Sequence, residues 1–202
     1  MNAFDVAFLL ARRMPVEKIK RYLSALYKDK VLYECVSFLF TAAIIACAVL
    51  FVENVLIINA RIPSASMEST INAGDLILGN RLSYIKKSPE RGDIVIFYEP
   101  DGSGQLYIKR IVGLPGDTVS IQDGKIFVND IQSDEYCPES AYTPSGMLQF
   151  PVLVPENSYF LLGDNRENSF DSRFWENTFL PKENIVGKAV FRYWPVWKMK
   201  NF

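Results

Sequence analysis

Histidine is absent from this chain of 202 residues. Its absence excludes a Ser-His-Asp or Cys-His catalytic centre and a zinc site with histidine ligands. The charges nearly cancel, with 22 Lys and Arg against 23 Asp and Glu, so there is no overall basic field to hold a nucleic acid. The three cysteines, Cys35, Cys47 and Cys137, form neither a CxxC pair nor a metal cluster. Any proton transfer must therefore use another side chain, and we expect no nucleic-acid partner.

A long uncharged run is the main feature of the N-terminal third. No Asp, Glu, Lys or Arg occurs in the 18 positions from Cys35 to Val52, enough for about 27 Å of helix. This predicts one membrane span, with a buried helix of a soluble core as the alternative. The run is too long, and too far from the first residue, for a cleavable signal peptide.

The residues before the run are more basic than acidic, with 7 Lys and Arg against 4 Asp and Glu. The positive-inside rule then predicts that residues 1–34 are cytoplasmic, that residues 35–58 form the span and its exit, and that residues 59–202 form a domain outside the cytoplasm. Residues 16–32 fit either an amphipathic helix on the inner membrane surface or a plain solvated helix.

Short apolar runs separated by turn residues follow the span. They predict strands at about 55–62, 76–80, 93–98, 106–112, 118–122, 125–128, 158–162 and 185–193. Asp123-Gly124 between two of these predicts a tight hairpin. Residues 133–150, rich in Pro, Ser and Gly, are typical of a long surface excursion. Because no helix is evident after the span, we expect a mainly β domain of antiparallel sheets.

Three segments hold side chains suited to chemistry. In Pro63 to Met67, Ser64 and Ser66 share one face of an extended chain, although serine is also an ordinary loop residue. Lys109 lies in a predicted strand on the same face as Tyr107. Burial there would depress its pKa and make it a usable base, whereas on an edge strand it would reach into water.

The third segment, Gly163 to Arg173, combines carboxylates, arginines and turn residues. Its oxygen ligands are compatible with a metal, but the spacing is not that of an EF-hand and the arginines would repel a cation. Pairing between Asp and Arg side chains that fixes the loop is the better interpretation. Together the three segments supply a serine nucleophile, a lysine base and a hydroxyl-rich loop to orient the lysine.

With these segments and Arg91-Gly92-Asp93, the chain resembles the bacterial type I signal peptidases, membrane-anchored serine proteases with a Ser-Lys dyad. The resemblance implies a partly closed, barrel-like core. It also implies that Ser66 is the nucleophile, Lys109 the general base, and Ser64 an oxyanion-hole donor together with the Ser66 N–H. Ser169 would orient the lysine, Asp171 and Arg173 would form a supporting ion pair, and Asp164 and Arg166 would belong to the scaffold of the loop. No metal or cofactor is implied.

The resemblance also implies a specificity and a location. Shallow apolar pockets would select Ala-X-Ala before the cut, in signal peptides of secretory preproteins that bind as an extended strand. Residues matching these pockets or their strands are Ile62, Pro63, Met67, Ile71, Ile77, Tyr107, Ile108 and Leu162. The protein would cross the plasma membrane once and have phospholipid as a partner. A contact with the secretion machinery is also compatible with the resemblance. Its compact form suggests the Gram-positive type.

Three positions depart from the pattern of the family: Ser69, Phe170 and Glu176 replace a common proline, a small residue and a common glycine. Two other functions remain open. One is a self-cleaving Ser-Lys protease related to the SOS-repressor peptidases, against which the membrane span counts. The other is a non-enzymatic, membrane-tethered β module that binds export substrates or wall components.

Overall fold

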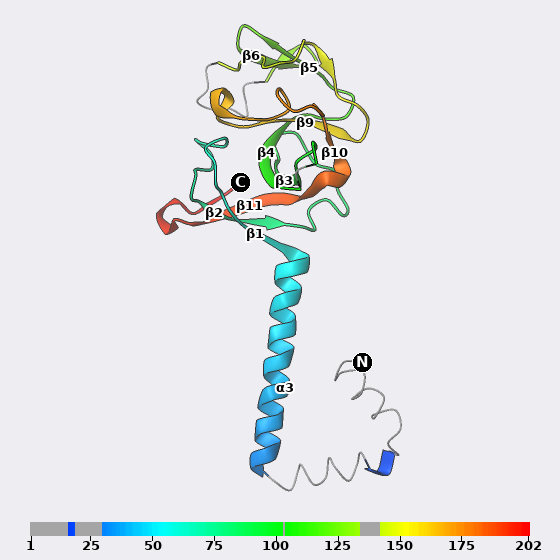
Figure 1. Cartoon of the computed structure of the whole chain (residues 1–202), viewed down its shortest axis with the longest axis vertical. Coiled ribbons are helices and arrows are strands. Elements are labelled where there is room, and N and C mark those ends of the chain that lie inside the picture. The colour runs from blue at the N-terminus through cyan, green and yellow to red at the C-terminus, as the bar shows by residue number, and fades with distance from the viewer. Residues whose placement is uncertain (1–15, 19–29, 103, 134–141) are drawn as a thin grey trace. The chain divides into compact units, whose positions relative to one another are not determined.

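The computed structural model describes residues 16–18, 30–102, 104–133 and 142–202 (Figure 1). The chain divides into two units, residues 1–51 and residues 52–202, and we call the second unit the β domain. Residues 16–18 are helical, but the rest of the predicted amphipathic helix up to residue 29 lies outside the described residues. Cys137 lies outside them as well.

A single long apolar helix precedes the β domain. Helix α3 spans Lys30–Phe51 and continues as a π-helical turn, Val52–Leu56. The helix and the turn together have 27 residues, and their most apolar stretch of 18 residues has a mean hydropathy of 2.7, so their length and composition suffice to cross a membrane. None of the side chains of α3 is buried in the protein, unlike those of a core helix in a soluble protein. The strand predicted from residue 55 was wrong at its start, because the apolar residues Val55 and Leu56 extend the helix.

The larger sheet of the β domain has eight strands, all paired antiparallel. Their bounds are β1 Ile57–Arg61, β2 Leu76–Asn80, β3 Ile94–Tyr98, β4 Leu106–Gly113, β9 Ser158–Leu162, β10 Leu180–Pro181, β11 Ile185–Trp194 and β12 Lys200–Asn201. Their order is β1-β2-β11-β3-β4-β9-β10, with β12 paired to β11. This path is open within the described residues, so the barrel-like closure expected from the resemblance is not confirmed.

A smaller antiparallel sheet has the order β7-β6-β5-β8. Its strands are β5 Thr118–Gln122, β6 Lys125–Val128, β7 Ile131–Gln132 and β8 Val152–Leu153. The hairpin predicted at Asp123-Gly124 joins β5 to β6, and both turn residues have positive φ, 50° and 75°. This is the turn geometry that Asp-Gly favours.

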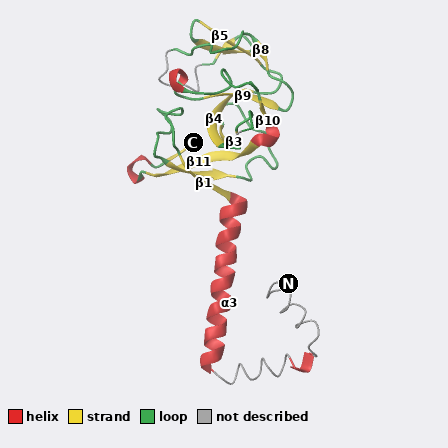
Figure 2. Ribbon diagram, viewed as in Figure 1, coloured by secondary structure: helices red, strands yellow, loops and turns green. Residues whose placement is uncertain are grey.

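The eight predicted strands are all present, which confirms a mainly antiparallel β domain after one apolar helix (Figure 2). Strands β7, β8, β10 and β12 were not predicted, because runs of two residues carry no alternation pattern. Helix in the β domain is limited, in the part that the structure describes, to the π-helical turn and three 3-10 turns.

Three apolar clusters fill the β domain, and the first supports the segment that follows β1. Ile62, Met67 and Ile71 are buried in it with Ile77 of β2 and Ile108 of β4. A second cluster lies around Phe97, Leu161 and Trp175, and a third around Phe160 and Val119. In the segment predicted as a surface excursion, the described residues 142–150 are exposed or half-buried except Thr143, which is buried and whose N–H donates to the Gly124 carbonyl. Residues 134–141 of that segment lie outside the described residues.

Candidate active site

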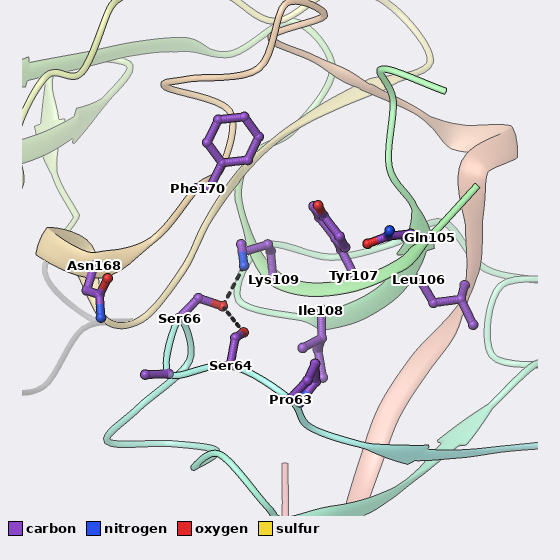
Figure 3. Close-up of a pocket in the computed structure, with 11 residues that line it drawn as sticks. Pro63, Ser64, Ser66, Gln105, Leu106, Tyr107, Ile108, Lys109, Asn168 and Phe170 are labelled. Atoms are coloured by element: carbon purple, nitrogen blue, oxygen red, sulfur yellow. Dashed lines mark hydrogen bonds between the residues drawn. The ribbon is translucent and has the colours of Figure 1, made fainter. Parts of the chain in front are cut away.

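A groove of about 580 Å³ lies where the segment after β1 meets β4 and the loop after β9 (Figure 3). It is lined by Pro63, Ser64, Ala65, Ser66, Gln105, Leu106, Tyr107, Ile108, Lys109, Asn168 and Phe170. Both serines of the first predicted segment and the predicted lysine therefore share one cavity, although Lys109 is 43 residues from Ser66 in the chain.

Ser66 and Lys109 are in direct contact at the floor of this groove. Lys109 Nζ donates a hydrogen bond to Ser66 Oγ at 2.6 Å (Figure 3). Ser66 is 7% exposed and Lys109 4%. The side chain of Lys109 does not reach into water, because it is buried and its amine bonds to Ser66 inside the protein.

Burial changes the acid–base behaviour of Lys109. Desolvation by burial lowers the pKa of its amine from 10.5 to about 8. The carboxylates of Asp171 and Asp164 act in the opposite direction, and the guanidinium of Arg173 adds to the lowering. The desolvation effect prevails, so about a tenth of the amine is neutral at pH 7 and can accept a proton.

The turn after Ser66 is anchored in the core. Glu68 N–H donates to the Ala65 carbonyl and Ile71 N–H to the Met67 carbonyl, while Met67 and Ile71 are fully buried. Ser66 is thus held at the start of a turn that is anchored in the core. Ser64, from the extended segment before it, brings its Oγ to 3.4 Å from Ser66 Oγ.

The loop after β9 packs directly on Ser66. The backbone N–H of Asn165 donates to the Ser66 carbonyl at 3.1 Å, and its side-chain amide donates to the Ala65 carbonyl at 3.1 Å. Gly163 is needed for this close approach, since a Cβ there would overlap the Ser66 carbonyl oxygen and Ser169 Oγ. In the sequence, only the run Gly163-Asp164-Asn165 hinted that this loop contacts Ser66.

The predicted pair between Asp171 and Arg173 is present and completely buried. Arg173 binds both carboxylate oxygens of Asp171, each at 2.8 Å, and neither side chain is exposed. The same carboxylate accepts the Gly163 N–H at 3.0 Å, and Arg173 also donates to the Pro144 carbonyl at 3.0 Å. The pair therefore connects the loop to β9 and to the segment around residue 144.

Asp164 forms a second bidentate pair that the sequence did not reveal. Its partner is Arg110 of β4, next to Lys109, at 2.8 and 2.6 Å. Arg110 also donates to the Gly92 carbonyl at 2.8 Å. Arg166 donates to the Gly163 carbonyl at 3.0 Å and to Thr143. These carboxylates face arginines, and the described residues contain no acidic, Cys or His cluster suited to a metal.

Ser169 lies beside the dyad, but its predicted hydrogen bond to the lysine is not formed. Its Oγ is buried and has no hydrogen-bond partner. Because Gly163 has no side chain, Ser169 Oγ and the Ser66 carbonyl oxygen both lie close to the place that a Cβ at position 163 would take.

The eight residues predicted for the substrate pockets fall into two groups. Pro63, Tyr107 and Ile108 line the groove. The others are buried core residues, namely Ile62, Met67, Ile71, Ile77 and Leu162. The sequence patterns did not indicate Ala65, Gln105, Leu106 or Asn168 as groove residues, and Phe170 stood out only for its bulk.

Residues 32–194 match the family described as signal peptidase, peptidase S26. The chain belongs to this family. Thylakoidal processing peptidase 1 of Arabidopsis thaliana is 43% identical to it over 150 residues, which cover 69% of this chain and 43% of that protein. Probable signal peptidase I-2 of Synechocystis is 41% identical over 140 residues, 67% of this chain and 62% of that protein.

A solved structure of signal peptidase I from Enterococcus faecalis is 33% identical and covers 50% of this chain and 97% of that one, with a TM-score of 0.42. The chain thus matches about two fifths to three fifths of the length of the two curated relatives named above.

Proposed function

We propose that the protein is a membrane-bound serine endopeptidase that removes signal peptides from exported preproteins. The observation that carries this proposal is the buried contact of 2.6 Å between Lys109 Nζ and Ser66 Oγ on the floor of an open groove. A buried amine of lowered pKa next to a serine hydroxyl is the arrangement needed to activate a nucleophile without histidine. Membership of the signal peptidase family supports the same activity.

The reaction follows from these two groups. Neutral Lys109 accepts the hydroxyl proton as Ser66 Oγ attacks the scissile carbonyl carbon, and the protonated amine then gives that proton to the leaving amine. The remaining acyl ester is hydrolysed by a water molecule that Lys109 deprotonates. Ser64 Oγ and the Ser66 N–H donate to the oxyanion, whose charge develops only on approach to the transition state.

The other site residues have positioning roles in this proposal. The pairs Asp171–Arg173 and Asp164–Arg110 fix the loop after β9 against Ser66 and β4. Ser169 Oγ, which is buried without a partner, would bond the lysine amine when the amine turns from Ser66 toward substrate. Neither pair touches the reacting atoms, so their effect on the chemistry is indirect.

The pairing of β4 supports binding of the substrate as an added strand. Strand β3 pairs with Leu106 to Arg110 along one side of β4, whereas β9 pairs with the other side only from Arg110 to Gly113. Among the described strands, none occupies the second side of residues 106–109, which border the groove. A peptide in extended conformation would complete the sheet there. Pro63, Tyr107 and Ile108 would then form the walls that admit small residues such as those of Ala-X-Ala.

In this proposal the apolar helix crosses the plasma membrane from about residue 35, with residues 1–34 cytoplasmic and residues 59–202 outside. The secretion machinery would be a neighbour rather than part of the site. The Gram-positive type stays a prediction.

The test is cleavage of a preprotein by the full chain in phospholipid vesicles. Lys109→Met keeps the apolar stem without the amine, so it should lose cleavage, as should Ser66→Ala, while the thermal unfolding midpoint is retained. Lys125→Met, at an exposed position of β6, is the matched control and should cleave normally. Wild-type cleavage by Lys109→Met would refute the proposal. Cleavage of the chain itself, faster than that of a preprotein, would instead favour the self-cleaving alternative.

A further inference from the structure

A surface turn begins where the chain leaves its apolar helix. We define this exit turn as residues 81–87, which follow β2. The backbone N–H of Arg81 donates to the carbonyl of Leu56 at 3.0 Å, and Leu56 is the last residue of the apolar helix. This hydrogen bond joins the start of the exit turn to the end of the proposed span. If α3 crosses a bilayer, as the proposed function holds, the exit turn lies at the bilayer surface.

The exit turn is built to present two apolar side chains to its surroundings. Leu82 N–H donates to Asn80 Oδ1 at 2.8 Å, and Ile85 N–H donates to the Leu82 carbonyl at 3.2 Å. Residues three apart in such a turn project from the same side. Leu82 is 42% exposed and Ile85 is 69% exposed. Leu82 is thus partly and Ile85 largely open to the surroundings, and the two apolar side chains are neighbours.

The aromatic residue of the exit turn, Tyr84, anchors the turn to the core of the β domain. Tyr84 packs against the cluster around Phe97, and its hydroxyl donates to Asp93 at 2.9 Å. The same carboxylate accepts from Lys188 of β11. The outward direction of Leu82 and Ile85 is thus a consequence of a fixed turn.

The charges of the exit turn suit a lipid surface. Lys86 and Lys87 are exposed next to Ile85, and Arg81 begins the turn. The turn itself has no acidic residue, and the next one along the chain is Glu90. Apolar side chains that enter the headgroup boundary, beside lysines that reach lipid phosphates, are the features of an interfacial membrane anchor. Each lysine near an anionic surface strengthens association about fivefold.

We propose that the exit turn is a second membrane contact, in which Leu82 and Ile85 enter the interface and Lys86 and Lys87 bind the phosphates of anionic phospholipids. The contact rests on the proposed membrane span, and it ties the β domain to the bilayer at a point 25 residues beyond Leu56 in the chain. It would restrain rotation of the β domain about the exit of the helix.

The test places an environment-sensitive fluorophore on the full chain, with its three native cysteines changed to serine. The label is attached through Ile85→Cys or, as the control, through Ile131→Cys, which is 73% exposed in β7. The small sheet that contains β7 has no strand paired to β1 or β2, and Figure 1 shows its strands β5 and β6 at the opposite end of the β domain from β1. Vesicles of phosphatidylcholine, with or without phosphatidylglycerol, carry nitroxide-labelled lipids as quenchers.

We expect the label at position 85 to be quenched and its emission shifted to the blue, and the label at position 131 to behave as in water. Lys86→Gln with Lys87→Gln should reduce the quenching at position 85 about tenfold or more with phosphatidylglycerol, and have little effect without it. Alkaline extraction tests the span, because a chain that crosses the bilayer resists it. If the chains resist extraction and both labels emit and are quenched as in water, the contact is overturned and the span stands. Chains released by alkaline extraction would instead refute the span, and the contact with it.

Discussion

The state of Lys109 makes the most direct quantitative prediction. Burial lowers the pKa of its amine from 10.5 to about 8 in the folded protein. At 1.36 kcal/mol per pKa unit, this difference from the unfolded chain corresponds to about 3 kcal/mol. Between about pH 8 and about pH 10.5 the unfolded chain binds more protons at this position than the folded one, so stability from this group rises with pH across that window. Below about pH 8 the cost of burying the charged amine is fully present.

The measurement compares the native chain with Lys109→Met by urea denaturation in detergent, followed through the fluorescence of buried Trp175. All other titrating groups are common to both proteins, so the difference between their free energies of unfolding isolates residue 109. That difference should change by about 3 kcal/mol, in favour of the native chain, as pH rises through the window from about 8 to about 10.5. A difference independent of pH in that window would refute a desolvated amine.

Three substitutions test the architecture around this amine. Asp171→Asn leaves the guanidinium of Arg173 buried without its counter-charge. It should lower the free energy of unfolding, measured by denaturation, by about 3–5 kcal/mol. A change below about 1 kcal/mol would show that the pair is dispensable. Gly163→Ala forces its Cβ into the Ser66 carbonyl and should abolish peptide cleavage, and full activity would contradict the close packing of the loop. Ser64→Ala should lower kcat about 10²-fold with little change in KM, whereas an unchanged kcat would exclude Ser64 from the oxyanion hole.

Local patterns predicted much of the fold. The alternation of apolar residues located all eight longer strands, and Asp123-Gly124 located the hairpin, because turn geometry and side-chain faces are properties of short segments. The same alternation placed Lys109 with Tyr107 on one face, and Lys109 Nζ lies 5.9 Å from the centre of the Tyr107 ring. The end of the apolar helix was misplaced, since Val55 and Leu56 favour strand and helix alike.

These local patterns could not predict contacts between segments that are far apart in the sequence. The partner of Asp164 is Arg110, 54 residues away, and an arginine in a strand gives no sign of which carboxylate it meets. The sequence also did not reveal how deeply side chains are buried: Met67 and Ile77 were matched to the substrate pockets or their strands, and both are fully buried in the core. Hydrophobicity indicates that a side chain is covered, whereas the fold decides whether protein or substrate covers it.

The central claim is that the amine of Lys109 activates the hydroxyl of Ser66. Its most direct test is mass spectrometry of the full chain after incubation with a serine-directed peptide acylating agent. We expect one adduct, on the peptide that contains Ser66, and at least a hundredfold slower formation in Lys109→Met. An adduct that forms at the native rate in Lys109→Met, or that is found on another serine, would contradict the dyad.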